Sequence, residues 1–251
     1  MTICRQLLRY VRARNDDNAM KIVQKKPIAG ETVVPTTGRI TISSLQLKVK
    51  HVYPNDVLKL TLLESIKSDR PILIPSRRWE SFELPSLTEN STKEVWNVKT
   101  TAAVDCPRFV ICCFQTNKKY NSEADPNFFD NIDISNIRLL LNGEYYPQEQ
   151  SRLKFGENDY AETYINYVKF MEMYSGHRKI AALDYAQYKD RALFVIDCSR
   201  RDETFKSSMV DIKLEIESRT GFPPKTRAHC IIVHDYVLEY LPLSESVRKI
   251  A

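Results

Sequence analysis

The chain has 251 residues, and its hydrophobic fraction of 43% is typical of a globular protein with a sizeable core. Only 6 glycines accompany 13 tyrosines and 10 phenylalanines, which argues against glycine-rich loops that cradle phosphate groups. The net charge of +5 resides in residues 1–26, which hold seven basic and two acidic residues, so the other 225 residues are formally neutral. We find no secretory signal peptide and no apolar run near the roughly 20 residues that span a bilayer.

Residues 1–28 form a basic N-terminal extension. A basic arm on a neutral body can bind nucleic acid by releasing counterions from the phosphates. The plainer alternative is a solvated or partly helical terminus. If the arm makes weak contact with nucleic acid, the residues involved are Arg5, Arg9, Arg12, Arg14, Lys25 and Lys26.

Residues 39–67 predict a strand followed by a helix. Apolar residues alternate with polar ones over 39–52, and the phase of the alternation changes at Ser43-Ser44, where we expect a bulge or a bend. A helix over 55–67 is expected next, because Asn55 or Asp56 can cap it. Its apolar face would contain Val57, Leu60, Leu63 and Ile66.

Three further strands and a hairpin are expected between residues 70 and 146. The first, 70–75, lies between prolines, which are typical of an edge strand or a strand end. The second covers 95–99. The third, 108–114, is a continuous apolar run, which indicates a strand buried on both faces. A long exposed loop is expected over 115–131, and Asn142-Gly143 predicts a tight hairpin within 137–146.

The C-terminal part predicts a helix over 159–174, a short helix over 184–189 and then four strands. The strands are 193–197, 210–217, 230–233 and 236–241, and His234-Asp235 is expected in a turn between the last two. Along 210–217, apolar residues alternate with charged ones, so one strand face is apolar and the other charged. Eight to ten strands with short connecting helices predict an all-β jelly-roll sandwich of two antiparallel sheets. Its expected core residues are Trp79, Trp96, Phe109, Ile111, Val195, Ile212, Leu214, Ile231 and Val233.

No residue pattern points clearly to catalysis. The six cysteines lack a CxxC pair, which is typical of buried reduced thiols. His229-Cys230 starts like a cysteine-phosphatase loop, but Tyr236 stands where the phosphate-binding Arg should be. His229, Cys230, His234 and Asp235 make a weak zinc site, because successive strand residues point to opposite faces. We assign no catalytic, cofactor-binding or metal-binding residue and predict that the protein is not an enzyme.

The chain also resembles a known family over residues 38–250. The resemblance rests on a run of strand and corner blocks: SDRPILIPSRRWESFELP, VWNVKT, PRFVICCFQTNKK, 137–170, 193–218 and AHCIIVHDYVLEYLPLSESVRKI. Together these blocks resemble the C-terminal part of the major capsid proteins of Polinton and adintovirus type. Their specificity comes from the order of the blocks, since none of them is a catalytic motif.

The resemblance implies a structural protein that self-assembles. Family members are double jelly rolls, three subunits of which form a capsomer of an icosahedral shell. Here we expect one jelly roll, residues 29–251, that matches the second sandwich, with the basic extension in place of the first. The expected partners are further copies in a trimer or a partner jelly roll, and the expected location is the virion, after intracellular assembly. Such a chain would be a viral protein or an endogenous viral element. The alternative is a monomeric jelly-roll module that binds a glycan or a protein.

Overall fold

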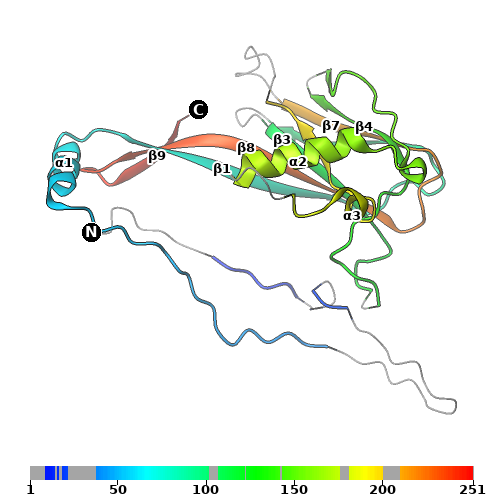
Figure 1. Ribbon diagram of the computed structural model, residues 1–251, viewed down its shortest axis with the longest axis horizontal. Coiled ribbons are helices and arrows are strands. Elements are labelled where there is room, and N and C mark those ends of the chain that lie inside the picture. Colours follow the sequence, from blue (N-terminus) through cyan, green and yellow to red (C-terminus); the bar gives the residue numbers. More distant parts are fainter. Residues whose placement is uncertain are drawn as a thin grey trace.

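The computed structural model describes residues 9–14, 16, 19–21, 38–101, 107–121, 123–141, 143–175, 181–199 and 210–250. Their strands form two antiparallel sheets that pack face to face (Figure 1). The strands are β1 (Ile72–Leu84), β2 (Lys93–Thr101), β3 (Pro107–Thr116), β4 (Ile134–Leu141), β5 (Glu144–Tyr146), β6 (Phe194–Asp197), β7 (Val210–Ser218), β8 (Thr226–Leu241) and β9 (Ser246–Ile250). The helices are α1 (Asp56–Lys67), η1 (Phe155–Glu157), α2 (Ala161–Ser175) and α3 (Tyr185–Tyr188).

The strand order is that of a jelly roll. One sheet has the strand order β1-β8-β3-β6, and the other has the order β2-β7-β4-β5. In the first sheet, β1 therefore pairs with β8, which is far away in sequence, and β3 and β6 follow on the other side of β8. Two four-stranded sheets linked in this way are the jelly-roll arrangement. Strand β9 adds to β8 beyond the sandwich. The expected all-β jelly roll with short helices is therefore confirmed.

The core lies between the two sheets and continues under α2. Buried side chains of both sheets form one cluster, which includes Cys112, Ile232, Leu139 and Leu214. Helix α2 covers the outer face of the sheet that contains β3, as Figure 1 shows. Its Phe170 ring lies 5.1 Å from the Phe109 ring in edge-to-face geometry. Residues 109–114 are therefore buried on both faces, as their continuous apolar run predicted.

Strands β1 and β8 continue well beyond the sandwich as a ribbon. They pair in one register from Ile72↔Tyr240 to Leu84↔Ala228, and β9 joins β8 at residues 237–241. At the far end of this ribbon stands α1 (Figure 1). The helix begins where Asn55 accepts a hydrogen bond of 2.9 Å from the Leu58 amide, the expected N-cap. The molecule is thus elongated, with the sandwich at one end and α1 at the other.

The expected turn at His234-Asp235 is wrong. Both residues lie in the middle of the 16-residue strand β8, where His234 pairs with Arg78 and Asp235 with Arg77. Asp235 accepts hydrogen bonds from Arg77 at 3.1 Å and from Arg108 at 2.7 Å. Because β1 supplies ladder partners without interruption, the polar dipeptide stays in the strand. The two predicted C-terminal strands are one.

The predicted strand over 39–52 is also absent among the described residues. This segment is exposed, and it pairs with no strand in the described part of the chain. A strand needs a neighbour for its amides and carbonyls, and the alternating pattern does not say where that neighbour is. The predicted helix over 55–67 is confirmed, but none of its residues is buried.

The loop over 115–131, which was expected to be exposed, is anchored by hydrogen bonds within the loop. Lys118 donates to Asp130 at 2.7 Å, and the Thr116 amide donates to the same carboxylate at 2.8 Å.

The hairpin is confirmed, since β4 and β5 pair on either side of residues 142–143 and Gly143 has a φ of 92°. No helix in the described part of the chain is long and apolar enough to cross a membrane.

Candidate interaction surface

The exposed apolar side chains are concentrated in two stretches of the chain, residues 38–75 and 236–250. We call residues 38–75 and 236–250 the distal projection, because they form the extended arm, α1 and the tip of the ribbon. Of the 27 exposed large hydrophobic residues in the described chain, 18 lie in this projection. They are Ile40, Ile42, Leu45, Leu47, Val49, Val52, Tyr53, Val57, Leu58, Leu60, Leu62, Leu63, Ile72, Leu73, Ile74, Leu243, Val247 and Ile250. Large exposed apolar patches are uncommon on monomeric proteins and are typical of interaction surfaces.

Helix α1 is apolar on several sides and packs on little. Val57 is 74% exposed and Leu60 63% exposed, while Leu58, Leu62 and Leu63 are about half exposed. A helix of 12 residues is marginal in water by itself, because most helix stability in proteins comes from packing of an apolar face. The helix therefore presents a surface suited to a partner.

The ribbon tip adds a second apolar surface beside α1. Across the three strands, Ile72, Tyr240 and Val247 lie in register, and Ile72 and Val247 remain 40% and 46% exposed. On the opposite face, Arg248 forms an ion pair with Glu239. The Leu243 amide donates to Asp69 at 3.0 Å, which ties the β8–β9 turn to the end of α1. The end of α1 and the ribbon tip thus lie next to each other.

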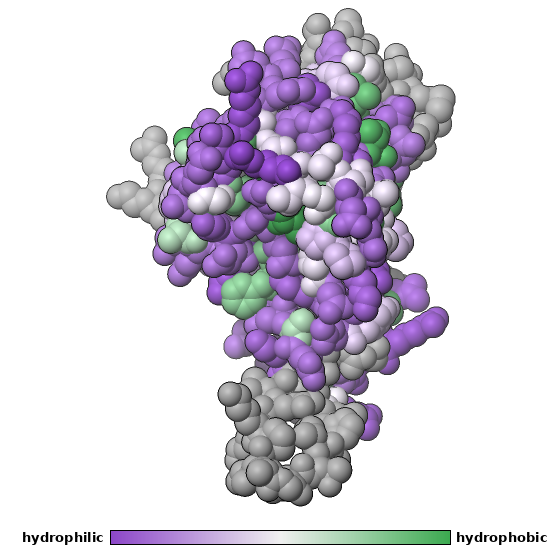
Figure 2. All heavy atoms as spheres, turned by 90° about the vertical axis from the view of Figure 1, so that its right-hand side faces the viewer, coloured by the Kyte–Doolittle hydropathy of each residue, from purple (hydrophilic) through white to green (hydrophobic). Residues whose placement is uncertain are grey.

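The opposite end of the molecule is polar. Figure 2 looks at the end of the sandwich and shows mainly hydrophilic side chains. A hollow of about 250 Å³ at the loops is lined in part by Glu89, Lys119, Lys225 and Arg227. Two of these cations are already paired, because Lys119 and Arg227 each contact Glu83 at 2.6 Å. This end lacks the apolar character of the distal projection.

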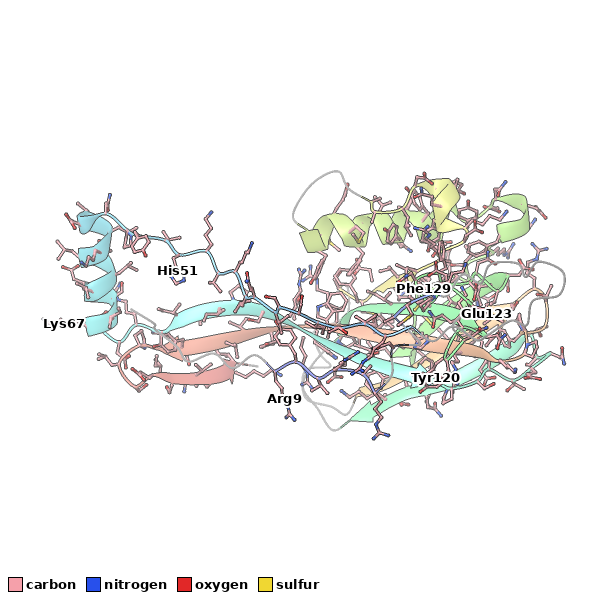
Figure 3. The ribbon with its side chains drawn as sticks, turned by 90° about the horizontal axis from the view of Figure 1, so that it is seen from below. Arg9, His51, Lys67, Tyr120, Glu123 and Phe129 are labelled. Carbon is pink, nitrogen blue, oxygen red and sulfur yellow. The ribbon has the colours of Figure 1, made fainter. Side chains whose placement is uncertain are left out.

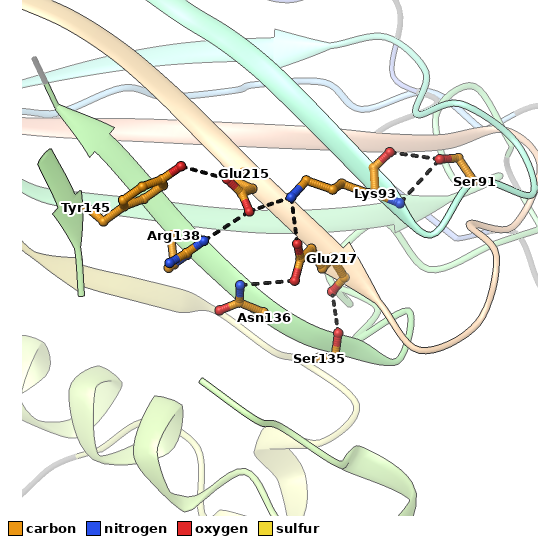
Figure 4. Close-up of polar contacts among 8 residues, drawn as sticks. All are labelled: Ser91, Lys93, Ser135, Asn136, Arg138, Tyr145, Glu215 and Glu217. Atoms are coloured by element: carbon orange, nitrogen blue, oxygen red, sulfur yellow. Dashed lines mark hydrogen bonds and ion pairs between the residues drawn. The ribbon is translucent and has the colours of Figure 1, made fainter. Parts of the chain in front are cut away.

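The outer face of the β2-β7-β4-β5 sheet carries an ordered polar network (Figure 4). Glu215, only 8% exposed, accepts hydrogen bonds from Lys93 at 2.7 Å and from Arg138 at 3.1 Å. Tyr145 donates to the same carboxylate at 3.3 Å, and its ring lies 4.1 Å from the Arg138 guanidinium carbon. Burial raises the pKa of Glu215, but the hydrogen bonds from Lys93 and Arg138 outweigh it, so the pKa is lowered overall. The carboxylate is therefore held ionised.

The described cysteines, His229 and His234 lie in or directly beside the strands of the sheets. Burial raises the pKa of the Cys230 thiol well above its ordinary value and that of Cys113 to about 12. Burial also lowers the pKa of His229, and His234 is buried with its Nε2 3.5 Å from Glu80. Cys112, Cys113, Cys198 and Cys230 are buried and form no disulfide bond, while Cys4 and Cys106 lie outside the described residues. No metal-binding group of three such side chains occurs in the described ranges.

The basic residues of the N-terminal extension are only partly described. Arg5, Lys25 and Lys26 lie outside the described residues, whereas Arg9, Arg12 and Arg14 are exposed. Arg9 lies on a segment outside the sandwich, as does His51 on the arm (Figure 3). Arg12 forms an ion pair of 2.7 Å with Asp16 and also donates to the Ile40 carbonyl at 2.7 Å. A hydrogen bond from the Ile40 amide, followed by that from Arg12, lowers the pKa of Asp16.

The residues expected in the core differ in their burial. The seven in the buried cluster are Trp96, Phe109, Ile111, Val195, Ile212, Leu214 and Val233. Ile231 is half-buried and packs against that cluster. Trp79 is 43% exposed, so it is not a core residue, and its ring contacts Tyr174 and Phe170 edge-on beside α2. The sequence offered no signal that Trp79 lies on the outer face of its strand. A bulky apolar residue fits the inner face of a sheet and an outer face covered by a helix equally well.

Sequence reasoning also missed the distal projection as an interaction surface. The periodic apolar residues of α1 and the arm predict faces of core elements, since periodicity reports an apolar face without naming what covers it. The one available signal was the excess of apolar positions in α1, where Val57, Leu58, Leu60, Leu62 and Leu63 spread beyond a single stripe.

Two solved virophage structures are similar to the chain, whereas the sequence has no match among curated proteins. The cryo-electron microscopy structure of the Sputnik virophage matches with 10% identity and a TM-score of 0.42 over 72% of this chain and 39% of that one. The crystal structure of the mavirus major capsid protein matches with 7% identity and a TM-score of 0.39 over 72% of this chain and 41% of that one. The chain therefore spans about two fifths of the length of these two structures.

A family model matches nearly the whole sequence. The family is described as the double jelly roll-like domain, and the match covers residues 2–238. The described residues show one jelly roll with the strand order of that architecture. Since the match extends over far more than half of the sequence, the chain belongs to the family of double jelly roll-like domains.

Proposed function

We propose that this chain is a structural, viral major-capsid-like protein that self-assembles through its jelly-roll subunit surfaces. The observation that carries the proposal is the gathering of 18 of the 27 exposed large hydrophobic residues in the distal projection. Surface of this kind is stabilised by burial against another subunit, at roughly 25 cal/mol per Å² of apolar area removed from water. A subunit whose role is assembly needs such a surface and needs no catalytic group.

The family and the fold support a structural role. A jelly roll supplies a stiff sandwich whose inner faces are filled by side chains, as the buried cluster shows here. In the described residues, β1 also presents a 13-residue outer edge without a neighbouring strand. Open edges are templates for pairing with another chain. The apolar distal projection and the open edge of β1 together favour association with other chains over a monomeric state.

The finer features of the proposal follow from the resemblance to capsid proteins. We propose a trimer or a pair with a second jelly roll as the building unit, residues 29–251 as the sandwich domain, and the virion as the final location. The seven buried core residues would maintain the sandwich during assembly. The basic extension would make weak contacts with nucleic acid.

Gel filtration with light scattering, followed by electron microscopy of the purified chain, tests the proposal. We expect oligomers that grow with concentration, because a stable contact buries roughly 1,200–2,000 Å². The double variant Leu60→Lys/Leu63→Lys should shift the chain towards monomer. The matched control Ile165→Lys replaces a residue of α2 that is 48% exposed on the sandwich and should leave assembly unchanged.

A strict monomer at all concentrations would contradict the proposal. Specific binding of a glycan or a protein by that monomer would then support the alternative, a jelly-roll binding module. Equal loss of assembly in the α1 variant and the α2 control would show that the contacts lie elsewhere than the distal projection.

A further inference from the structure

The arm, residues 38–53, is an extended segment that has the pattern of a strand and no partner strand in the described part of the chain. It runs from the N-terminal region to α1 away from both sheets (Figure 1). Leu45 and Leu47 are 65% and 60% exposed, and all residues of the arm are exposed. Backbone hydrogen bonds between residues 41–53 and the rest of the described chain are absent. The arm thus offers a row of backbone donors and acceptors together with an apolar face.

We propose that the arm pairs with the arm of a second copy in an antiparallel ladder centred on Leu47. This inference rests on the proposed self-assembly and names its partner and one of its contacts. A two-fold contact requires a surface that is complementary to itself, so that residue i meets residue j and j meets i. The arm satisfies this condition in its sequence.

Centring the two-fold axis on Leu47 places apolar residues opposite apolar residues. On one face of the ladder, Leu47 faces Leu47 and Leu45 faces Val49; on the other face, which carries the lysines, Ile42 faces Val52. The two lysines of the arm face polar residues: Lys48 faces Gln46 and Lys50 faces Ser44. No like charges therefore lie directly opposite each other. Cross-strand pairs of this kind each contribute roughly 0.2–1 kcal/mol, and directly opposed like charges are destabilising.

Neighbouring registers are less favourable. Centring on Lys48 places the two Lys48 side chains opposite each other, and centring on Val49 places Lys48 opposite Lys50. Centring on Gln46 places Val49 opposite Ser43 and Ile42 opposite Lys50. The hydrophobic pattern therefore selects one register, as it does wherever one face of a strand pair is apolar.

Helix α1 supplies the cover that such a ribbon needs. A two-stranded ribbon alone is marginally stable in water and requires packing on one face. Helix α1 begins at Asp56, three residues after the arm, and its Leu60 and Leu63 are exposed. Packed on the ribbon, α1 would cover Leu45, Leu47 and Val49, and the lysines would face solvent.

Disulfide trapping tests the register. In a background with Cys4→Ser and Cys106→Ser, Leu47→Cys should form a disulfide-linked dimer of about twice the 29.2 kDa chain mass under mild oxidation. Opposed residues have Cβ atoms roughly 4.5–5.5 Å apart, close enough for a disulfide after a small shift. The matched control Leu45→Cys should give no dimer alone, because it faces Val49, but should form one when mixed with Val49→Cys.

Three results would overturn the inference. The first is no cross-link for Leu47→Cys above that of the parent chain. The second is equal cross-linking of Leu45→Cys alone. The third is a cross-link between Leu47→Cys and Ile74→Cys in place of the symmetric one, which would show that the arm adds to the edge of β1.

Light scattering on the parent chain separates this inference from the proposed function. Oligomers without the symmetric Leu47 cross-link would overturn the arm contact and leave self-assembly standing, whereas monomers without it would overturn both. As a second variant, Leu47→Arg places two like charges at the axis and should weaken the arm contact at least tenfold. Lys48→Arg keeps the charge pattern and should leave it unchanged. Both residues lie outside the core, so folding should persist in each variant.

Discussion

Glu215 has hydrogen-bond partners on three other strands of its sheet. It lies on β7 and receives hydrogen bonds from β2 through Lys93, from β4 through Arg138 and from β5 through Tyr145. The carboxylate therefore links all four strands of its sheet. Because its folded pKa is lowered, the folded state favours the ionised form more than the unfolded chain does.

The sign of this shift gives a pH dependence. Stability from Glu215 is fully present above the unfolded pKa of a glutamate, about 4.3, and is lost as the pH falls through the lower folded pKa. We predict that Glu215→Gln lowers the free energy of unfolding by about 1–3 kcal/mol at neutral pH, the range for hydrogen bonds to a charged group. The difference from the parent chain should shrink as the pH falls below about 4.

Urea unfolding between pH 3 and pH 7 measures this effect. Glu172→Gln, a substitution of an exposed residue on α2, serves as the control and should change stability little at any pH. A Glu215→Gln deficit that stays constant over the whole pH range would show that the ionised carboxylate is not what the network stabilises.

At the scale of the element, β7 shows how one strand serves two environments. Its apolar residues Ile212, Leu214 and Ile216 are buried in the sandwich, while its charged residues face outwards, where Glu215 anchors the network. Leu214 lies between Trp96 of β2 and Leu139 of β4 in the ladder, both of them buried. The alternation along β7 therefore predicted the inner and outer faces of its whole sheet.

We predict that Leu214→Ala lowers the free energy of unfolding by about 2–5 kcal/mol, because it removes buried methyl groups and leaves a cavity. Val95→Ala on the adjoining strand should cost under about 1 kcal/mol, since Val95 is 53% exposed. Chemical denaturation of the two variants checks the contrast. Similar losses for both would mean that the outer face of this sheet is covered by another subunit.

Helix α2 illustrates a limit of periodicity at the same scale. Its aromatic residues pack: Tyr167 and Phe170 are buried, and the Tyr164 ring contacts that of Tyr188 on α3 edge-on. The apolar positions of α1 are equally regular, yet none is buried. The two patterns differ in what lies opposite them, which is a property of the tertiary structure.

At the scale of the whole molecule, most of the exposed apolar side chains of the described residues lie outside the sandwich. The arm and α1 carry the exposed apolar residues, and residues 1–26 carry the full net charge of +5. A chain arranged in this way can associate through one region and contact a polyanion through another.

We predict that the chain binds duplex DNA weakly, with an affinity that falls as salt rises, and that deletion of residues 1–26 abolishes this binding. Each phosphate contact contributes about −0.9 to the slope of log K against log salt. Arg9→Ala and Arg14→Ala should each reduce the slope by about 1, whereas Arg12→Ala should change it less, because Arg12 is paired with Asp16. Fluorescence anisotropy at several salt concentrations measures the slope, and unchanged binding after the deletion would refute the contact.

Local sequence patterns correctly predicted those elements whose turn residues or hydrophobic period lie within the element itself. The hairpin at residues 142–143, the N-cap at Asn55, the apolar strand 108–114 and the alternating strand 210–217 are all confirmed, because turn chemistry and period depend on neighbours in sequence. The turn at His234-Asp235 was wrong for a related reason. A polar dipeptide normally marks a turn, but here Arg77 and Arg108 pair with Asp235 and keep it in the ladder.

The sequence by itself determined the fold class, the position of most sandwich strands along the chain and the segregation of basic charge, since alternation, apolar runs and composition are local properties. Only the tertiary structure decided which apolar faces are covered. It buried Phe109 and Phe170 against each other, left Trp79 and α1 exposed, and left the arm unpaired among the described residues. An apolar pattern reports that a face favours burial, while the partner that buries it is fixed by contacts between residues far apart in the chain or on another copy.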